Sequence, residues 1–230
     1  MVSHIHTESD LDFGLAALAQ AEPRFAALVA LAGRPPLRRR SGGFAGLAST
    51  VVSQQLSTAS AGAIWGRLAA AFDPVTPEAI IGARKERLMR IGLSRPKIRA
   101  LKEIARAIVR GDLKPDTLGD IDADAAHAAL TAVHGIGPWT ADIYLLASLG
   151  HADAWPAGDL ALQEAVRLAF GLKTRPTTKE MGPLAEPWRP WRAVAARVLW
   201  TYYRAVKGRE GAPVLPKKST TPKGKKKNGR

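Results

Sequence analysis

Apolar side chains recur every three to four residues along almost the whole chain, which is the spacing of one face of an α-helix. From residue 96 to residue 110, for example, Ile98, Leu101, Ala105 and Ile108 fall on a single stripe. No run of alternating β-branched residues indicates a strand. The pattern therefore predicts an all-α fold, with helices over residues 11–19, 23–32, 44–54, 58–71, 77–82, 85–91, 96–110, 123–132, 138–149, 160–170, 178–184 and 190–207.

The composition narrows the class of protein. Of the 230 residues, 46% are hydrophobic, which is enough for a full core, and none is cysteine. The lack of cysteine excludes disulfides, iron–sulfur clusters, thiolate zinc sites and a cysteine nucleophile. The chain has no apolar run of membrane-spanning length, and its first ten residues lack the apolar core of a secretory signal. We therefore expect a cytoplasmic protein with no membrane partner.

The net charge of +14 favours a polyanionic partner, usually nucleic acid, although a solubilising surface explains the charge equally well. Residues 211–230 include six lysines, one arginine and no acidic residue, so they carry +7 of that charge. We predict that residues 208–230 form a disordered basic tail. A second basic run, Arg34–Arg40, is interpreted as a solvated connector.

A glycine pair, Gly135 and Gly137, separates two helical patterns. Glycines two residues apart allow a tight turn between helices, and without Cβ atoms a phosphate can approach the backbone closely. Pro138 suits the first turn of the next helix, whose free N–H groups form a binding site for phosphate. A contact of this kind is indifferent to base sequence. The alternative is that this segment is a simple turn between two packed helices.

Asp159 follows Gly158 and precedes a helix whose apolar face carries Leu162 and Val166. An Asp at such a position is commonly an N-cap. The partial positive charge of a helix start also stabilises a carboxylate in its ionised form. Asp153 is the competing acid in this loop, and we interpret it as a loop residue.

The stretch from Leu130 to Val166 contains the Gly-Ile-Gly turn, then a loop rich in glycine and proline, then Asp159. It resembles the helix-hairpin-helix motif of the DNA glycosylase superfamily. The resemblance implies that Asp159 is the catalytic carboxylate. In that role its negative charge stabilises the cationic sugar formed when an N-glycosidic bond breaks, and it can orient or deprotonate the attacking water. Trp139 stands where bifunctional members carry a lysine that attacks the sugar and cleaves the strand. The resemblance therefore implies hydrolytic base removal that leaves an abasic site, with no lyase activity.

Two further segments resemble the DNA-3-methyladenine glycosylase II branch of that superfamily. The Ser-Gln-Gln-Leu-Ser turn at 53–57 implies that Gln55, with Gln54 beside it, fills the hole left by a flipped nucleotide; polar capping is the alternative for Gln54. The segment 186–200 places Trp200 opposite the core face of its helix. We expect Trp139 and Trp200 to sandwich a cationic alkylated purine, because indoles attract cations.

The resemblance also implies the architecture and the partners. It implies two helical subdomains with a cleft between them, residues 41–150 ending in the hairpin and residues 1–40 with 151–207. The expected substrates are 3-methyladenine and 7-methylguanine in double-stranded DNA, bound by a monomer. No cofactor is expected beyond a sodium or potassium ion held by the carbonyls of Thr131, Val133 and Gly135. The residues expected to contact DNA are Gln54, Gln55, His134, Gly135, Gly137 and Thr140.

Three positions depart from the pattern of the branch. His134 stands where many members carry proline, and Ile143 and Leu160 stand where some relatives place pocket tyrosines. The pocket is therefore expected to be less aromatic, with a different substrate range. A non-catalytic helix-hairpin-helix protein that binds DNA is the alternative function, and it differs from the enzyme in needing no carboxylate at Asp159.

Overall fold

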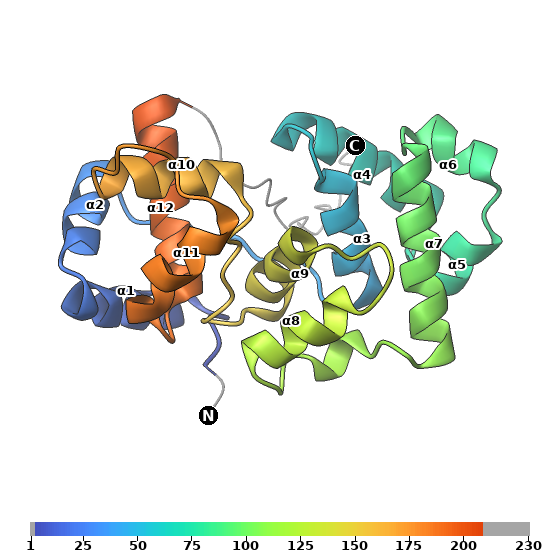
Figure 1. Cartoon of the computed structure of the whole chain (residues 1–230). Coiled ribbons are helices and arrows are strands. Elements are labelled where there is room, and N and C mark those ends of the chain that lie inside the picture. Colours follow the sequence, from blue (N-terminus) through green and yellow to red (C-terminus); the bar gives the residue numbers. More distant parts are fainter. Residues whose placement is uncertain (1–2, 209–230) are drawn as a thin grey trace, which may run out of the picture.

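The computed structural model describes residues 3–208 and consists of helices joined by loops (Figure 1). The all-α prediction is confirmed, since the only β-type pairing among the described residues is an isolated bridge between His4 and His151. No described helix is both long and apolar enough to cross a bilayer. Apart from residue 208, the predicted basic tail lies outside the described residues. The elements are α1 (Glu8–Ala21), α2 (Arg24–Ala32), α3 (Gly43–Ser53), α4 (Thr58–Ala71), α5 (Pro77–Gly82), α6 (Lys85–Ile91), α7 (Arg95–Arg110), the short η1 (Pro115–Thr117), α8 (Ala123–Thr131), α9 (Pro138–Tyr144), the π-helix η2 (Leu145–Leu149), α10 (Leu160–Ala169), α11 (Thr178–Ala185), the short η3 (Glu186–Trp188) and α12 (Arg192–Lys207).

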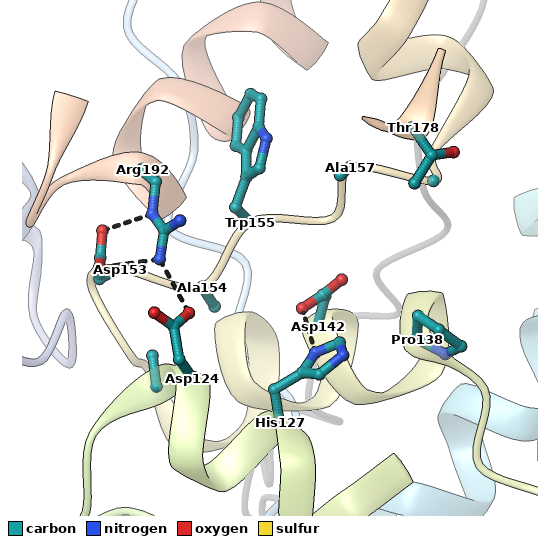
Figure 2. Close-up of a pocket in the computed structure, with 12 residues that line it drawn as sticks. Asp124, His127, Pro138, Asp142, Asp153, Ala154, Trp155, Ala157, Thr178 and Arg192 are labelled. Atoms are coloured by element: carbon teal, nitrogen blue, oxygen red, sulfur yellow. Dashed lines mark hydrogen bonds and ion pairs between the residues drawn. The ribbon is translucent and has the colours of Figure 1, made fainter. Parts of the chain in front are cut away.

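The helices form two groups, and most contacts between helices are made within a group. In one group α12 packs against α1, α2 and α10; in the other α7 packs against α3 and α5, and α9 packs against α3 and α8 (Figure 1). A cavity of about 270 Å³ lies where the groups meet, lined by residues of α8, α9, α11 and α12 (Figure 2). The division at residues 41 and 150 remains a prediction.

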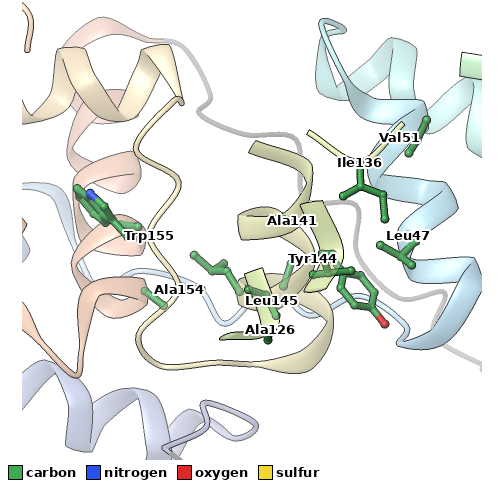
Figure 3. Packing of buried hydrophobic residues seen from close by; sticks show 14 of the residues in the cluster. Leu47, Val51, Ala126, Ile136, Ala141, Tyr144, Leu145, Ala154 and Trp155 are labelled. Atoms are coloured by element: carbon green, nitrogen blue, oxygen red, sulfur yellow. The ribbon is translucent and has the colours of Figure 1, made fainter. Parts of the chain in front are cut away.

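A continuous apolar core runs through both groups. Figure 3 shows Leu47 of α3 and Tyr144 of α9 on one side, and Trp155 of the loop before α10 on the other. All three side chains are buried. These buried side chains lie on both sides of α9. Packing on both sides holds the helix in place, because burial of apolar surface contributes about 25 cal/mol per Å². The hairpin and the loop that carries Asp159 are thereby placed next to each other.

The periodicity predicts one regular α-helix over residues 138–149, but the helix that follows the hairpin is not regular along its whole length. It changes to a π-helix at Leu145, and its last carbonyls are bound by arginines from distant segments. Arg197 donates to the Leu146 carbonyl at 3.0 Å, and Arg39 donates to the Ser148 carbonyl at 3.1 Å. These contacts place positive charge at the helix C-terminus, where the helix dipole favours it.

The interpretation of Arg34–Arg40 as a solvated connector is wrong for its last two residues. Arg39 is half-buried, and Arg40 is only 4% exposed and donates to the Thr50 hydroxyl at 2.9 Å. Burial lowers the pKa of Arg40 to about 10 and that of Arg197 to about 10. The sequence pattern could not reveal this, because a basic run looks the same whether it faces water or the junction of two helical groups.

Candidate active site

The hairpin turn between α8 and α9 depends on one of its two glycines for its shape. Gly135 has a φ of +99°, and a Cβ atom there would lie 2.8 Å from the Cα atom of Ala100 in α7. Gly137 has a φ of −84°, and no atom lies within 4 Å of the position of a Cβ. Gly135 therefore allows the turn to pack against α7, whereas Gly137 leaves open space at the start of α9.

The outer face of the turn is exposed. His134 and Gly137 are both exposed, while Ile136 between them is buried and anchors the turn in the core. Gly137 is the N-cap of α9 and no side chain caps this helix start. The N–H groups of the first turn are thus available to an oxygen-rich partner, as the sequence predicted for this segment.

Asp159 lies at the start of α10 and is an N-cap. Its Oδ1 atom accepts a hydrogen bond from the Leu162 backbone N–H at 2.9 Å. The Nε1–H of Trp200 donates to the same oxygen at 3.1 Å, and the Nε1–H of Trp139 donates to Oδ2 at 2.9 Å. Tertiary structure thus brings together the three side chains that the sequence proposed for catalysis and base binding, although α9, α10 and α12 carry them far apart along the chain.

Asp159 is 7% exposed, and its carboxylate is hydrogen-bonded to two half-buried tryptophans. Its neighbours in the chain are exposed: Gly158 is at the surface and Leu160 is 62% exposed. The site is therefore a sheltered carboxylate at the molecular surface. A fixed negative charge with hydrogen-bond donors on both oxygens can stabilise a positive charge that forms nearby.

The proposed wedge turn is held in place by neighbouring elements. Gln54 donates through Nε2 to the Thr140 hydroxyl at 2.7 Å, so two residues predicted to contact DNA bind each other. Gln55 is exposed and has a φ of +54°, and it is the only non-glycine residue in the described part of the chain with a positive φ. Such backbone strain often marks a functional position.

Lys97 of α7 is a further part of this turn that sequence reasoning missed. Its ammonium group donates to the carbonyls of Val52 and Gln54, at 2.9 and 2.8 Å, and burial lowers the pKa of Lys97. No local signal distinguishes this lysine from the other basic residues of its helix.

The cavity between the two helical groups is lined by charged residues that do not include Asp159 (Figure 2). Arg192 pairs with Asp153 at 2.7 Å and with Asp124 at 3.2 Å. The interpretation of Asp153 as a loop residue is consistent with these ion pairs, because both of its oxygens are bound by arginine. The cavity lies beside the loop that carries the catalytic candidate.

A second charged pair in the same cavity joins α8 to α9. The Nδ1 atom of His127 lies 2.8 Å from Oδ1 of the buried Asp142. The hydrogen bond to Asp142 raises the pKa of His127, and burial raises the pKa of Asp142. Within residues 3–208, no group of three or more His, Asp or Glu side chains is placed to hold a metal ion.

The carbonyls of Thr131, Val133 and Gly135 belong to the end of α8 and the turn that follows. The Val133 carbonyl accepts the Ile136 N–H at 3.0 Å, which leaves its second lone pair available. Neutral carbonyl oxygens are suitable ligands for a hard cation. The donor set therefore fits an alkali ion, and its binding remains a prediction.

Comparisons with known proteins agree on one family. A family model described as "HhH-GPD superfamily base excision DNA repair protein" matches residues 48–190. DNA-3-methyladenine glycosylase 1 of Schizosaccharomyces pombe is 32% identical over 176 residues, 75% of this chain and 76% of that protein.

Solved structures agree with the sequence comparison. The S. pombe 3-methyladenine DNA glycosylase Mag1 in complex with abasic DNA gives a TM-score of 0.73 at 29% identity, covering 83% of this chain and 95% of Mag1. A DNA-3-methyladenine glycosidase of Bacillus halodurans gives a TM-score of 0.72 at 27% identity, covering 85% and 90% of the two chains.

Proposed function

Because this chain belongs to the HhH-GPD superfamily of base excision DNA repair proteins, and is related to the 3-methyladenine glycosylases, we propose that it hydrolyses the N-glycosidic bond of alkylated purines in double-stranded DNA. The substrates we propose are 3-methyladenine and 7-methylguanine. The enzyme acts as a monomer, flips the damaged nucleotide out of the duplex and leaves an abasic site.

The observation that carries this proposal is the position of Asp159. Its carboxylate lies at the start of α10, after the loop that follows the hairpin helix, and accepts hydrogen bonds from two tryptophans. Loss of a purine leaves positive charge on the sugar, which the negative charge of Asp159 stabilises. The same carboxylate orients the attacking water. A purine alkylated at a ring nitrogen is already cationic and leaves readily, so one carboxylate suffices.

DNA is held, on this proposal, by contacts that do not depend on base sequence. The exposed start of α9 at Gly137 binds a phosphate, and the hairpin carbonyls of Thr131, Val133 and Gly135 hold an alkali ion that supports the same contact. Gln55, at its exposed and strained turn, fills the gap in the base stack. Mag1, whose fold is similar, was solved in complex with abasic DNA, which supports DNA as the partner.

The side chain at position 139 supports hydrolysis without strand cleavage. A lyase needs an amine that forms a Schiff base with the sugar, and the indole of Trp139 offers none. Strand nicks that appear in lesion-bearing duplex before alkali treatment would contradict this part of the proposal.

The deciding experiment compares wild type with Asp159→Asn on methylated duplex DNA, with chromatography of the bases released. Asn is as good an N-cap as Asp, so the variant keeps the hydrogen bond from Leu162, although its amide nitrogen cannot accept the one from Trp139. Thermal unfolding checks that the variant is folded. We expect wild type to release free alkylated purines and the variant to release none, while both bind DNA. No release by wild type, together with normal DNA binding, would instead favour a non-catalytic DNA-binding protein.

A further inference from the structure

We infer that Trp139 and Trp200 are positioning residues for Asp159, whose indole N–H groups hold the carboxylate so that one acceptor site of Oδ2 faces the reacting nucleoside. This inference rests on the proposed function. It assigns to the indole edges a role separate from any contact between the ring faces and a base.

A count of the acceptor sites supports this assignment. An ionised carboxylate accepts about two hydrogen bonds on each oxygen. On Oδ1 both sites are taken, by the Leu162 backbone N–H at 2.9 Å and by Trp200 at 3.1 Å. On Oδ2 one site is taken, by Trp139 at 2.9 Å. The remaining site on Oδ2 is therefore the one left for the sugar or for the water.

The two indoles also prevent the carboxylate from rotating. A turn about the bond to the carboxylate carbon would break the hydrogen bonds to Trp139 and Trp200 together, since one binds each oxygen. Donors that are in place before the reaction require no rearrangement when charge develops, which is how fixed dipoles accelerate bond cleavage. Hydrogen bonds to a charged group are also the stronger kind.

The two hydrogen bonds do not use the ring faces. An N–H bond lies in the plane of its indole, so a tryptophan that donates to Asp159 turns its edge, and not its face, toward the carboxylate. Stacking on a base and orientation of Asp159 are compatible roles for one side chain. Phenylalanine separates them, because it keeps an aromatic face and lacks the N–H.

Trp155 offers a matched control on the same scaffold. Its Nε1–H donates at 3.0 Å to the Met181 carbonyl, a hydrogen bond of similar length that does not involve Asp159. It is also buried, so Trp155→Phe reports the cost of losing an indole N–H bond inside this protein. Effects specific to the carboxylate are those that Trp155→Phe does not show.

The test measures two quantities for Trp139→Phe, Trp200→Phe and Trp155→Phe. One is the single-turnover rate of 7-methylguanine release at saturating enzyme, and the other is the Kd for duplex containing a tetrahydrofuran abasic analogue. We expect Trp139→Phe and Trp200→Phe each to lower the rate by about tenfold to a hundredfold, the effect of one lost hydrogen bond to a charged group. Their Kd should change by less than about threefold. Trp155→Phe should change both the rate and the Kd by less than about threefold.

Rates within about threefold of wild type for both Trp139→Phe and Trp200→Phe would overturn the inference, whether or not Kd weakens. If only Kd weakens, the indoles help to bind the DNA and do not orient Asp159. Thermal unfolding checks that each variant is folded, and if Trp200→Phe is not, Trp139→Phe carries the test alone. Asp159→Asn separates the two claims: a variant that still releases base refutes the proposed function, whereas an inactive one beside fully active Phe variants refutes the inference alone.

Discussion

Gly135→Ala should destabilise the protein strongly, for two reasons that the structure gives separately. The φ of +99° is a conformation that costs an alanine about 1–2 kcal/mol. The added methyl group would lie 2.8 Å from the Cα atom and 2.9 Å from the Cβ atom of Ala100, and overpacking of this kind costs about 1–3 kcal/mol. We expect a loss of roughly 2–5 kcal/mol in the free energy of unfolding.

The matched control is Gly137→Ala, two residues away in the same turn. Its φ of −84° suits alanine, and the methyl group meets no atom within 4 Å. The remaining cost is that alanine is a weaker N-cap than glycine, which lowers the free energy of unfolding by less than about 1 kcal/mol. Urea denaturation followed by circular dichroism measures both variants. A difference of less than about 0.5 kcal/mol between them would refute the reasoning.

The same pair should show the opposite order in DNA binding. Gly137 lies at the exposed start of α9, where we propose that a phosphate contacts the backbone, so a methyl group there weakens binding directly. Gly135→Ala puts its methyl group against α7 and not on that surface, so it acts on DNA binding only indirectly, through the shape of the turn. Fluorescence anisotropy with duplex DNA, well below the unfolding transition, measures this. Stronger impairment by Gly135→Ala than by Gly137→Ala would contradict the assignment of the phosphate contact.

Two further predictions concern Lys97 and His127. Lys97→Met frees the two carbonyls before Gln55, so affinity for duplex with an abasic analogue should fall more than affinity for intact duplex; equal losses in an anisotropy titration would exclude a role in the wedge turn. The hydrogen bond to Asp142 raises the pKa of His127 above its ordinary 6.5, so the stability it contributes is complete below pH 6.5 and is lost as the pH rises through the folded-state pKa. The free energy of unfolding of wild type, measured with urea, should therefore fall above pH 6.5 relative to that of His127→Gln. Parallel pH curves for the two proteins would rule out this linkage.

Local features of the sequence predicted most of the helices and the centre of the candidate site. The period of the apolar positions predicted an all-α fold, and the helix predicted to end at residue 110 does end there, where Gly111 adopts a left-handed conformation. The sequence predicts Asp159 as a helix N-cap and proposes it as the catalytic carboxylate, and the residue is an N-cap in the structure. Such features are readable because they depend on residues within about four positions of each other.

Errors occurred where a contact with a distant segment changed the local pattern. The last helix begins at Arg192 and not at residue 190, and Glu186–Trp188 forms a separate short helix before it. Residues 145–149 continue α9 as a π-helix, where Arg197 and Arg39 bind its final carbonyls. Periodicity contains no information about donors that arrive from elsewhere in the chain.

By itself, then, the sequence determined the helices, the glycine turn and the acid at the start of α10. Only the tertiary structure decided which donors reach that acid, which of the two glycines touches α7, and that Arg40 is buried. The physical reason is that helix formation follows from neighbouring residues, whereas the partner of a side chain depends on how irregular loops orient whole helices against each other. Those orientations are set by packing over the entire core and not by any single segment.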